Sequence, residues 1–305
     1  MEFSTSIVFM GTPDFAVWTL KHLWNNKFPI EMVVTNPDRP AGRGMQLKPS
    51  PVKQWALKHD LPVIDDFDKF MDWLDQQTSK PANQQTSKPI IVIVAYGKIL
   101  PARLVNNYTC INLHASLLPL YRGASPIQTC LLNGDDTTGV TTMLINEKMD
   151  AGDILLKKEI DIDENETVSK LHDRLAEAGA DLLADTLRHL PDIKPVSQND
   201  SEATYCRKIK KEDRLLDLSA GYEKVHNTVR AIGGYYFDGK KRISITRTMI
   251  KNTVGTTVVL SIDANDDTIK ELIKLTEHLD LWVKPEGKKE MTIEDYLRGR
   301  RKDDS

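Results

Sequence analysis

The sequence has few cysteines, no long apolar run and no strong excess of either charge. Its 305 residues include three cysteines, Cys110, Cys130 and Cys206, which are far apart and odd in number. They offer neither a disulfide framework nor a paired-cysteine metal clip, so we expect reduced thiols and no metal. No stretch approaches the roughly 18 apolar residues of a membrane span, and the amino-terminal MEFSTSIVFMG lacks the basic leader of a signal peptide. We therefore expect a cytoplasmic protein without membrane contact.

The net charge of −3 gives no overall basic character, so binding to nucleic acid has to be argued from local patches. One patch lies between Asn36 and Lys58, where the sequence contains five cationic residues and a single acidic residue, Asp38. Two further basic clusters lie at 207–214 and 240–251. Each cluster alone is most simply a solvated surface, whereas three in one chain are compatible with a phosphate-rich partner.

Short apolar runs alternate with amphipathic segments through the first half of the chain. The predicted strands are 6–10, 30–35, 90–95, 110–113, 138–146 and 154–160. The predicted helices are 15–24, 51–59, 101–106 and 167–190. This alternation is typical of a parallel sheet flanked by helices, so we predict an α/β, Rossmann-like first domain.

A second, smaller domain is predicted after residue 204. The polar, proline-containing segment 191–204 is predicted to link domains at 1–190 and 205–305. After a predicted helix at 222–232, short β-type runs follow at 242–250, 253–262, 269–275 and 279–283. Short strands at this spacing suggest a small barrel or curled sheet, and we expect a C-terminal β-barrel that is OB-like.

A tandem QQTSKP repeat occupies 76–81 and 84–89. Its polar composition cannot bury a core, so it is predicted to form a surface loop rather than a repeat fold. We expect no catalytic role for it.

An asparagine and a histidine stand two positions apart at the end of the apolar run CINLH. On a strand this spacing places Asn112 and His114 on the same face, at the strand end where α/β sheets bind ligands. A carboxamide donor and a titratable base can there meet one substrate atom. Alone, an Asn-x-His pair is a weak signal of an active site. Polar pairs at strand ends more often belong to loops in which the polar groups are hydrogen-bonded within the protein.

The wider context is more specific. The segment NLHASLLPLYRGASPIQ at 112–128, together with MDAGD at 149–153, resembles the folate-dependent formyltransferases, and most closely the members that act on methionyl-tRNA. The resemblance is strong over about residues 5–160 and returns in islands to the end of the chain. It implies that 1–190 is a formyltransferase catalytic domain and 205–305 a tRNA-binding domain.

The resemblance also implies residue roles. Asn112 would donate to the oxyanion that forms when an amine attacks a formyl group, His114 would handle the proton, and Asp150 would orient the imidazole. Asp150 can alternatively be a turn former, because Asp before a small residue and glycine favours tight turns. The implied donor is 10-formyltetrahydrofolate, without a metal. Its implied contacts are Ser116, Leu117, Leu118 and Pro119, and Val94, Ala95, Tyr96 and Gly97.

The acceptor has to be inferred from outside this core, because related enzymes share the core and differ in the amine they formylate. The basic, glycine-rich segment 38–53 resembles the loop that tRNA-acting members place against the acceptor stem, with Arg39, Arg43 and Lys48 as candidate contacts. The resemblance thus implies formylation of the α-amine of methionine on initiator Met-tRNA, for translation initiation, and we expect a monomer. A sugar N-formyltransferase acting on a nucleotide-linked amino sugar and a catalytically idle RNA-binding relative stay open as alternatives.

Overall fold

The structure, a computed structural model, describes residues 3–41, 44–78, 88–251 and 267–303 and divides into two compact units. The first unit comprises 1–123, 139–160 and 172–205. The second comprises 124–138, 161–171 and 206–305. Each compact unit is made of more than one stretch of the chain, whereas the sequence predicts two consecutive domains. The domain boundaries stay a prediction.

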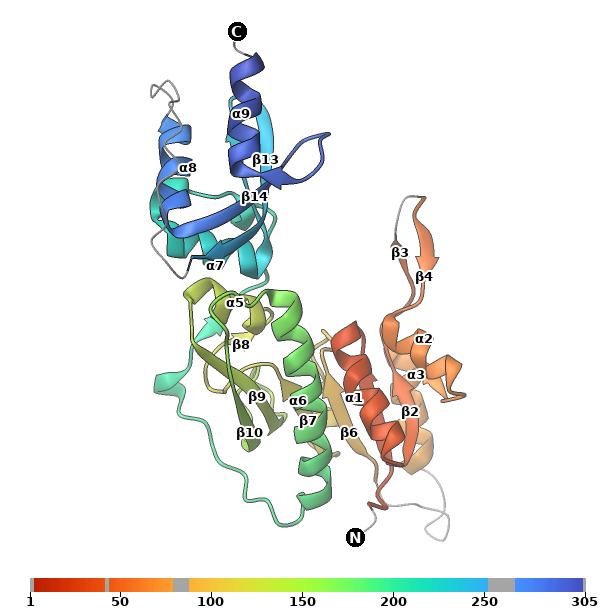
Figure 1. Ribbon diagram of the computed structural model, residues 1–305. Helices are drawn as coiled ribbons and strands as arrows, with labels where there is room; N and C mark the ends of the chain where they lie inside the picture. The colour runs from red at the N-terminus through yellow and green to blue at the C-terminus, as the bar shows by residue number, and fades with distance from the viewer. Residues whose placement is uncertain (1–2, 42–43, 79–87, 252–266, 304–305) are drawn as a thin grey trace. The chain divides into compact units, whose positions relative to one another are not determined.

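The first unit is built on a seven-stranded sheet with the order β10-β9-β7-β6-β1-β2-β5 (Figure 1). Its strands are β1 (Ile7–Gly11), β2 (Ile30–Val34), β5 (Val63–Ile64), β6 (Ile90–Val94), β7 (Cys110–His114), β9 (Thr137–Leu144) and β10 (Ile154–Asp161). In the sheet order, the neighbouring strands β7, β6, β1, β2 and β5 pair in parallel, whereas β9 runs antiparallel to β7. The predicted α/β class is therefore confirmed, with a sheet that is mixed but dominated by parallel pairs.

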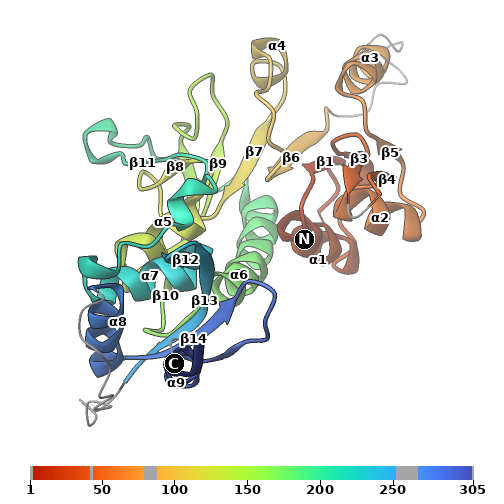
Figure 2. The same cartoon turned by 90° about the horizontal axis from the view of Figure 1, so that it is seen from above.

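Helices cover both faces of this sheet. They are α1 (Asp14–Asn25), α2 (Pro51–Lys58), α3 (Phe67–Thr78), α4 (Ala102–Val105) and α6 (Val168–His189). Figure 2 shows α3 and α4 on one side of the central strands and α1 and α6 on the other. All residues of β1 and β6 are buried, which explains why both strands are continuous apolar runs in the sequence. None of the helices in the described part of the chain combines the length and apolar composition needed to span a membrane.

Glycine allows α6 to approach the strand that carries the Asn-x-His pair. A Cβ atom at Gly179 would lie only 2.8 Å from Cδ2 of Leu113 in β7, so no larger residue fits without displacing that side chain. Leu113 is itself buried between Asn112 and His114. The close contact between Gly179 in α6 and Leu113 therefore fixes the position of the end of β7, which carries the two polar residues.

The second unit contains a four-stranded antiparallel sheet with the order β12-β13-β14-β15. Its strands are β12 (Gly234–Asp238), β13 (Lys241–Ile250), β14 (Leu279–Pro285) and β15 (Met291–Thr292), and its α-helices are α5 (Pro126–Asn133), α7 (Tyr222–Ile232), α8 (Asp267–His278) and α9 (Ile293–Asp303). The predicted small β domain is thus confirmed as an antiparallel sheet. The predicted strand at 253–262 lies outside the described residues.

The predicted strand at 269–275 is wrong, because this segment belongs to helix α8. Its buried residues are Ile269, Leu272, Leu275 and Thr276, a spacing of three and four that places them on one side of a helix. The run is too short for periodicity alone to separate a strand from a helix. The tertiary contacts of that side with the core of the second unit decide the outcome.

The connection between β10 and α6 packs within the second unit. Nε2 of His226 in α7 lies 3.0 Å from the backbone oxygen of Glu164, and Asn165 accepts a hydrogen bond from the backbone of Ile250. Burial lowers the pKa of His226, so this contact uses the neutral ring. A chain cut near residue 205 would therefore separate segments that pack together.

The segment 191–204 is not a free tether. Val196 and Ile154 exchange two backbone hydrogen bonds, of 2.8 and 2.9 Å, and the side chain of Gln198 contacts Arg122. Asn199 caps the short 3-10 helix η2 (Asp200–Glu202). The predicted linker is thus a packed part of the first unit, because its polar residues pair with the protein and not only with solvent.

Candidate active site

The ends of β6 and β7 lie side by side at one edge of the first unit's sheet. In their parallel ladder Ile93 is opposite Asn112, and Val94 is opposite Leu113. The loops that follow, at 95–97 and 115–119, therefore leave the sheet next to each other. The predicted catalytic and folate-contacting segments meet at the carboxyl edge, where α/β sheets bind ligands.

His114 is held by a backbone carbonyl. It is 7% exposed, and its Nε2 lies 2.9 Å from the backbone oxygen of Tyr121. Because a carbonyl only accepts hydrogen bonds, we assign the proton of the neutral ring to Nε2, which leaves the lone pair on Nδ1. Nδ1 lies 3.8 Å from Oδ2 of Asp150, too far for a hydrogen bond but within ion-pair distance. A proton taken up at Nδ1 would therefore be held beside a carboxylate.

Asp150 occupies a strained position on the loop between β9 and β10. Its φ of 50° is left-handed, a conformation that a residue with a Cβ adopts only when its surroundings hold it there. Its Oδ2 accepts a 2.8 Å hydrogen bond from the backbone of Gly123. A Cβ at Gly152 would lie 1.7 Å from the carbonyl oxygen of Leu144, so the turn requires glycine there. Asp150 is thus both a turn residue and a carboxylate directed at His114.

Asn112 is partly exposed, on the same face of β7 as His114. Among the described residues, none hydrogen-bonds its carboxamide. Two of the predicted catalytic residues, His114 and Asp150, are therefore in contact, and the third has its amide available for a ligand. The assignment of catalytic roles to the three residues stays a prediction.

The predicted folate segment at 116–119 divides into internal and external residues. Thr141 donates a 2.6 Å hydrogen bond to the carbonyl of Ser116, whose own hydroxyl donates to the carbonyl of Leu120, also at 2.6 Å. Leu118 is fully buried. Leu117 and Pro119 are partly exposed, so their side chains are the ones that a ligand can reach directly.

The predicted folate segment at 94–97 divides in the same way. Val94 and the ring of Tyr96 lie in the core, whereas Ala95 and Gly97 are exposed and have φ values of 48° and 77°. The carbonyl of Tyr96 accepts a 2.9 Å hydrogen bond from the amide of Asn36. The loop can therefore offer backbone groups to a ligand at Ala95 and Gly97, while Tyr96 anchors it.

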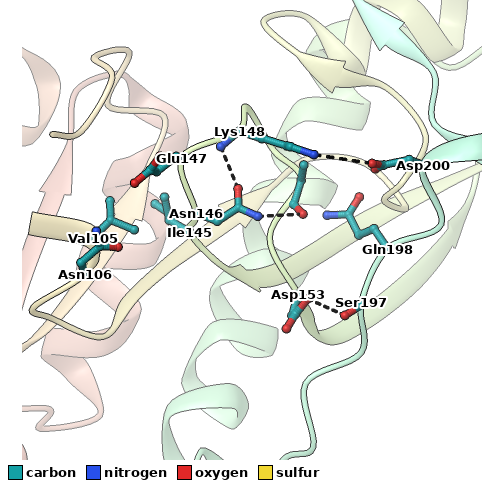
Figure 3. Close-up of a pocket in the computed structure, with 11 residues that line it drawn as sticks. Val105, Asn106, Ile145, Asn146, Glu147, Lys148, Asp153, Ser197, Gln198 and Asp200 are labelled. Atoms are coloured by element: carbon teal, nitrogen blue, oxygen red, sulfur yellow. Dashed lines mark hydrogen bonds and ion pairs between the residues drawn. The ribbon is translucent and has the colours of Figure 1, made fainter. Parts of the chain in front are cut away.

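A cavity of about 610 Å³ lies beside the loop that carries Asp150 (Figure 3). It is lined by residues of that loop, such as Asn146 and Lys148, and by Gln198 and Asp200 from the segment predicted to be a linker. Its described lining does not include His114 or Asp150. Sequence reasoning assigned no function to Gln198, since a polar residue in a proline-containing segment gives no signal of its own.

Two of the three predicted tRNA-contacting residues, Arg39 and Lys48, lie on a β-hairpin, where the sequence suggested a loop. Strand β3 (Arg39–Ala41) pairs with β4 (Gln46–Lys48), and Arg39 stands directly opposite Lys48. Both side chains are exposed. Arg43 lies outside the described residues. The hairpin therefore presents at least two neighbouring cations to solvent.

Lys53 does not add to this cationic surface. Its Nζ lies 2.6 Å from Asp38 and 2.7 Å from Asp65, and these hydrogen bonds raise the pKa of Lys53. The hydrogen bond to Lys53 in turn lowers the pKa of the Asp65 carboxyl. This triad joins the start of the hairpin to α2 and to the end of β5, so the charge of Lys53 is compensated within the protein.

Comparison with known proteins assigns the chain to a family. Residues 5–187 match the family described as formyl transferase, and residues 208–301 match the formyl transferase C-terminal domain. The chain therefore belongs to the formyltransferase family. Within it, the chain belongs with the methionyl-tRNA formyltransferases: the protein of that name from Caldanaerobacter subterraneus subsp. tengcongensis is 39% identical over 303 residues, covering 96% of each sequence.

Solved structures share the fold. The methionyl-tRNA formyltransferase from Clostridium thermocellum superposes with a TM-score of 0.54 at 19% identity, covering 82% of this chain and 95% of that one. An N-formyltransferase from Helicobacter canadensis, solved with folinic acid and dTDP-3-aminofucose, gives a TM-score of 0.63 at 19% identity, covering 85% and 93%. At this identity the two structures establish the fold alone.

Tyr96→Phe tests the position of the Tyr96 ring. Its hydroxyl is buried without a hydrogen-bond partner among the described residues. Removing the hydroxyl should therefore either increase the free energy of unfolding or lower it by less than about 1 kcal/mol. Burial, with a smaller contribution from Asp66, raises the pKa of Tyr96 from 10.0 to about 12. Wild-type stability should therefore fall between these pH values by a component that the variant lacks, because the folded state holds the proton longer.

Urea unfolding at several pH values and spectrophotometric titration of tyrosine measure this effect. Tyr205→Phe, at an exposed tyrosine, is the control. A destabilisation above about 2 kcal/mol in Tyr96→Phe would show that the hydroxyl does have a partner.

Proposed function

We propose that this chain transfers a formyl group from 10-formyltetrahydrofolate to the α-amino group of methionine on initiator Met-tRNA. One observation supports the proposal most. The carboxamide of Asn112, which has no hydrogen-bond partner among the described residues, lies at the same sheet edge as the His114–Asp150 pair. This arrangement occurs in a chain that is related over 96% of its length to a methionyl-tRNA formyltransferase. The reaction would belong to the start of protein synthesis, in the cytoplasm.

The geometry suits attack of an amine on a formyl carbon. The carbonyl oxygen becomes an oxyanion as the new C–N bond forms, and the amide NH₂ of Asn112 is the donor for that charge. Nδ1 of His114 takes the proton that the attacking amine loses, and Asp150 stabilises the resulting imidazolium. Collapse of the intermediate breaks the bond from carbon to the folate nitrogen, which receives the proton from His114.

The donor site is proposed at the two loops that leave β6 and β7. The planar pyrimidine ring of a reduced folate can pair through its polar edge with backbone groups, and exposed backbone is available at Ala95 and Gly97. The partly exposed side chains of Leu117 and Pro119 offer apolar contact beside it. The related N-formyltransferase solved with folinic acid supports a folate donor for this family.

The hairpin β3–β4 supports an RNA acceptor. Arg39 and Lys48 stand directly opposite each other, although like charges in that arrangement repel. Binding of a phosphate between them would turn this repulsion into attraction. The Lys53 triad anchors the base of the hairpin, so that the two cations project from a fixed support.

Label transfer from 10-formyltetrahydrofolate tests the function. The purified protein is offered charged initiator Met-tRNA, charged elongator Met-tRNA and a nucleotide-linked amino sugar in parallel. We expect label on the initiator Met-tRNA. Label on the sugar would make the chain a sugar N-formyltransferase, and RNA binding without any transfer would make it an idle binding relative. The elution volume of the same preparation tests the expectation of a monomer.

Removing either proposed catalytic side chain should reduce turnover strongly. Asn112→Ala and His114→Ala are each expected to lower kcat by roughly 10²-fold or more, because both groups act mainly in the transition state. Binding of the folate should change little. The controls are Asn26→Ala and His189→Ala, which remove the same chemical groups at exposed sites. Near-normal turnover in either site variant would exclude that residue from the mechanism.

Removing the hairpin cations should affect tRNA and not chemistry. For the double variant Arg39→Ala/Lys48→Ala, we expect KM for Met-tRNA to rise roughly tenfold, with kcat nearly unchanged. The slope of log affinity against log salt concentration should become shallower by roughly one to two. Lys21→Ala/Lys157→Ala removes the same charge elsewhere and should change neither quantity. An equal salt slope in both double variants would contradict a phosphate contact at the hairpin.

A further inference from the structure

The side chain of Gln198 uses all of its main hydrogen-bonding capacity inside the protein. Its oxygen accepts from Nε and Nη2 of Arg122, at 3.0 and 2.8 Å. Its Nε2 donates to the carbonyl of Asp150 at 2.9 Å and to the carbonyl of Gly152 at 2.7 Å. One carboxamide therefore joins Arg122 to the loop that carries the proposed catalytic carboxylate.

The orientation of this carboxamide is fixed by chemistry. A guanidinium only donates and a backbone carbonyl only accepts, so the oxygen of Gln198 has to face Arg122 and its NH₂ has to face the loop. The reverse orientation would leave four unmatched contacts. Glutamine is therefore specified here, because a glutamate would place oxygen against two carbonyl oxygens and an apolar residue would leave them unpaired.

Arg122 is the fixed end of the arrangement. It is 2% exposed, and its Nη2 also lies 2.9 Å from Oδ1 of Asp200, which is at the protein surface. A buried guanidinium needs its donors occupied and its charge compensated. Gln198 supplies the acceptor and Asp200 the charge, so Arg122 and the segment 198–200 hold each other in place. In Figure 3, Gln198 and Asp200 face the loop that carries Asn146 and Lys148.

The loop that Gln198 holds is the strained one. The left-handed backbone at Asp150 is disfavoured for a residue with a Cβ. The carbonyls bound by Gln198 lie at this residue and two residues later. Together with the hydrogen bond from Gly123 to its carboxylate, they determine both the backbone and the side-chain direction of Asp150.

We infer that Gln198, held by Arg122, is a positioning residue for formyl transfer: it fixes the backbone of Asp150 so that the carboxylate stays directed at His114. The inference rests on the proposed function, in which Asp150 stabilises the protonated ring. It gives the segment 191–204 a part in the active site.

Gln198→Glu isolates this role. The variant keeps the shape of the side chain and the contact with Arg122, but it loses the two bonds to the loop and sets a carboxylate against the carbonyls. We expect kcat to fall roughly tenfold, with KM for folate and for Met-tRNA changed less than about threefold. Gln54→Glu is the matched control, because it makes the same change at an exposed glutamine whose Nε2 also donates to a backbone carbonyl, that of Pro49. Unchanged kcat in Gln198→Glu would overturn the inference.

Thermal unfolding shows whether Gln198→Glu folds. If it does not, Gln198→Met removes the same two donors without adding charge, and the same kinetic comparison applies to it. The expected fall in kcat, at unchanged KM, is the same for both variants.

A double-mutant cycle separates positioning of Asp150 from a general structural effect. In an Asp150→Asn background, Gln198→Glu should lower kcat less than about twofold further, because the group it positions is already lost. A full tenfold loss in that background would overturn the inference. If Asp150→Asn alone keeps wild-type turnover, the proposed role of Asp150 fails, and with it the inference. If Asp150→Asn is impaired while Gln198→Glu is not, only the inference fails.

Discussion

The parallel ladder between β6 and β7 is the constraint on which the site depends. Because Val94 is opposite Leu113, the chain leaves both strands at the same height, and the loops at 95–97 and 115–119 begin side by side. A shift of this register by one residue would turn Asn112 and His114 to the other face of the sheet. Burial of β6 and close packing of Gly179 against Leu113 prevent such a shift.

The site is built from strained backbone that the surrounding protein holds in place. Ala95, Tyr121 and Asp150 all have positive φ values, and all three lie in the loops that surround His114. Each is restrained by hydrogen bonds close to it: Asn36 holds the carbonyl after Ala95, His114 holds that of Tyr121, and Gln198 holds that of Asp150. The strain is local, whereas two of the three restraints, those from Asn36 and Gln198, come from distant parts of the sequence. This arrangement produces a rigid site at loop positions.

The two compact units are interleaved in sequence. Helix α5 and the segment 161–171 belong to the second unit, although stretches of the first unit precede and follow each of them along the chain. Buried His226 and Arg230 contact backbone carbonyls at Glu164 and Asp163, which gives this connection partners that a solvent-exposed turn would not need. The second unit therefore completes its own packing with pieces of chain that leave and re-enter the first sheet.

Local patterns in the sequence determined much of the fold and part of the site. Apolar runs such as those of β1 and β6 predict buried strands. The two-residue spacing of Asn112 and His114 places both side chains on one face, because side chains alternate along a strand. The segment 269–275 forms a helix where its apolar pattern predicts a strand, since so short a run carries too little periodicity. Likewise, no local pattern distinguished 191–204 from a free linker.

Which distant groups meet depends on the tertiary packing of the chain. The loop after β9 returns Asp150 to 3.8 Å from His114, and the chain beyond α6 brings Gln198 onto that loop. Such contacts depend on how buried hydrogen-bonding groups find partners across the fold, and a glutamine in a polar segment carries no sign of the partner it will have. The order of residues at the end of β7 is enough to specify the chemistry there, whereas the packing of the chain sets what holds that chemistry in place.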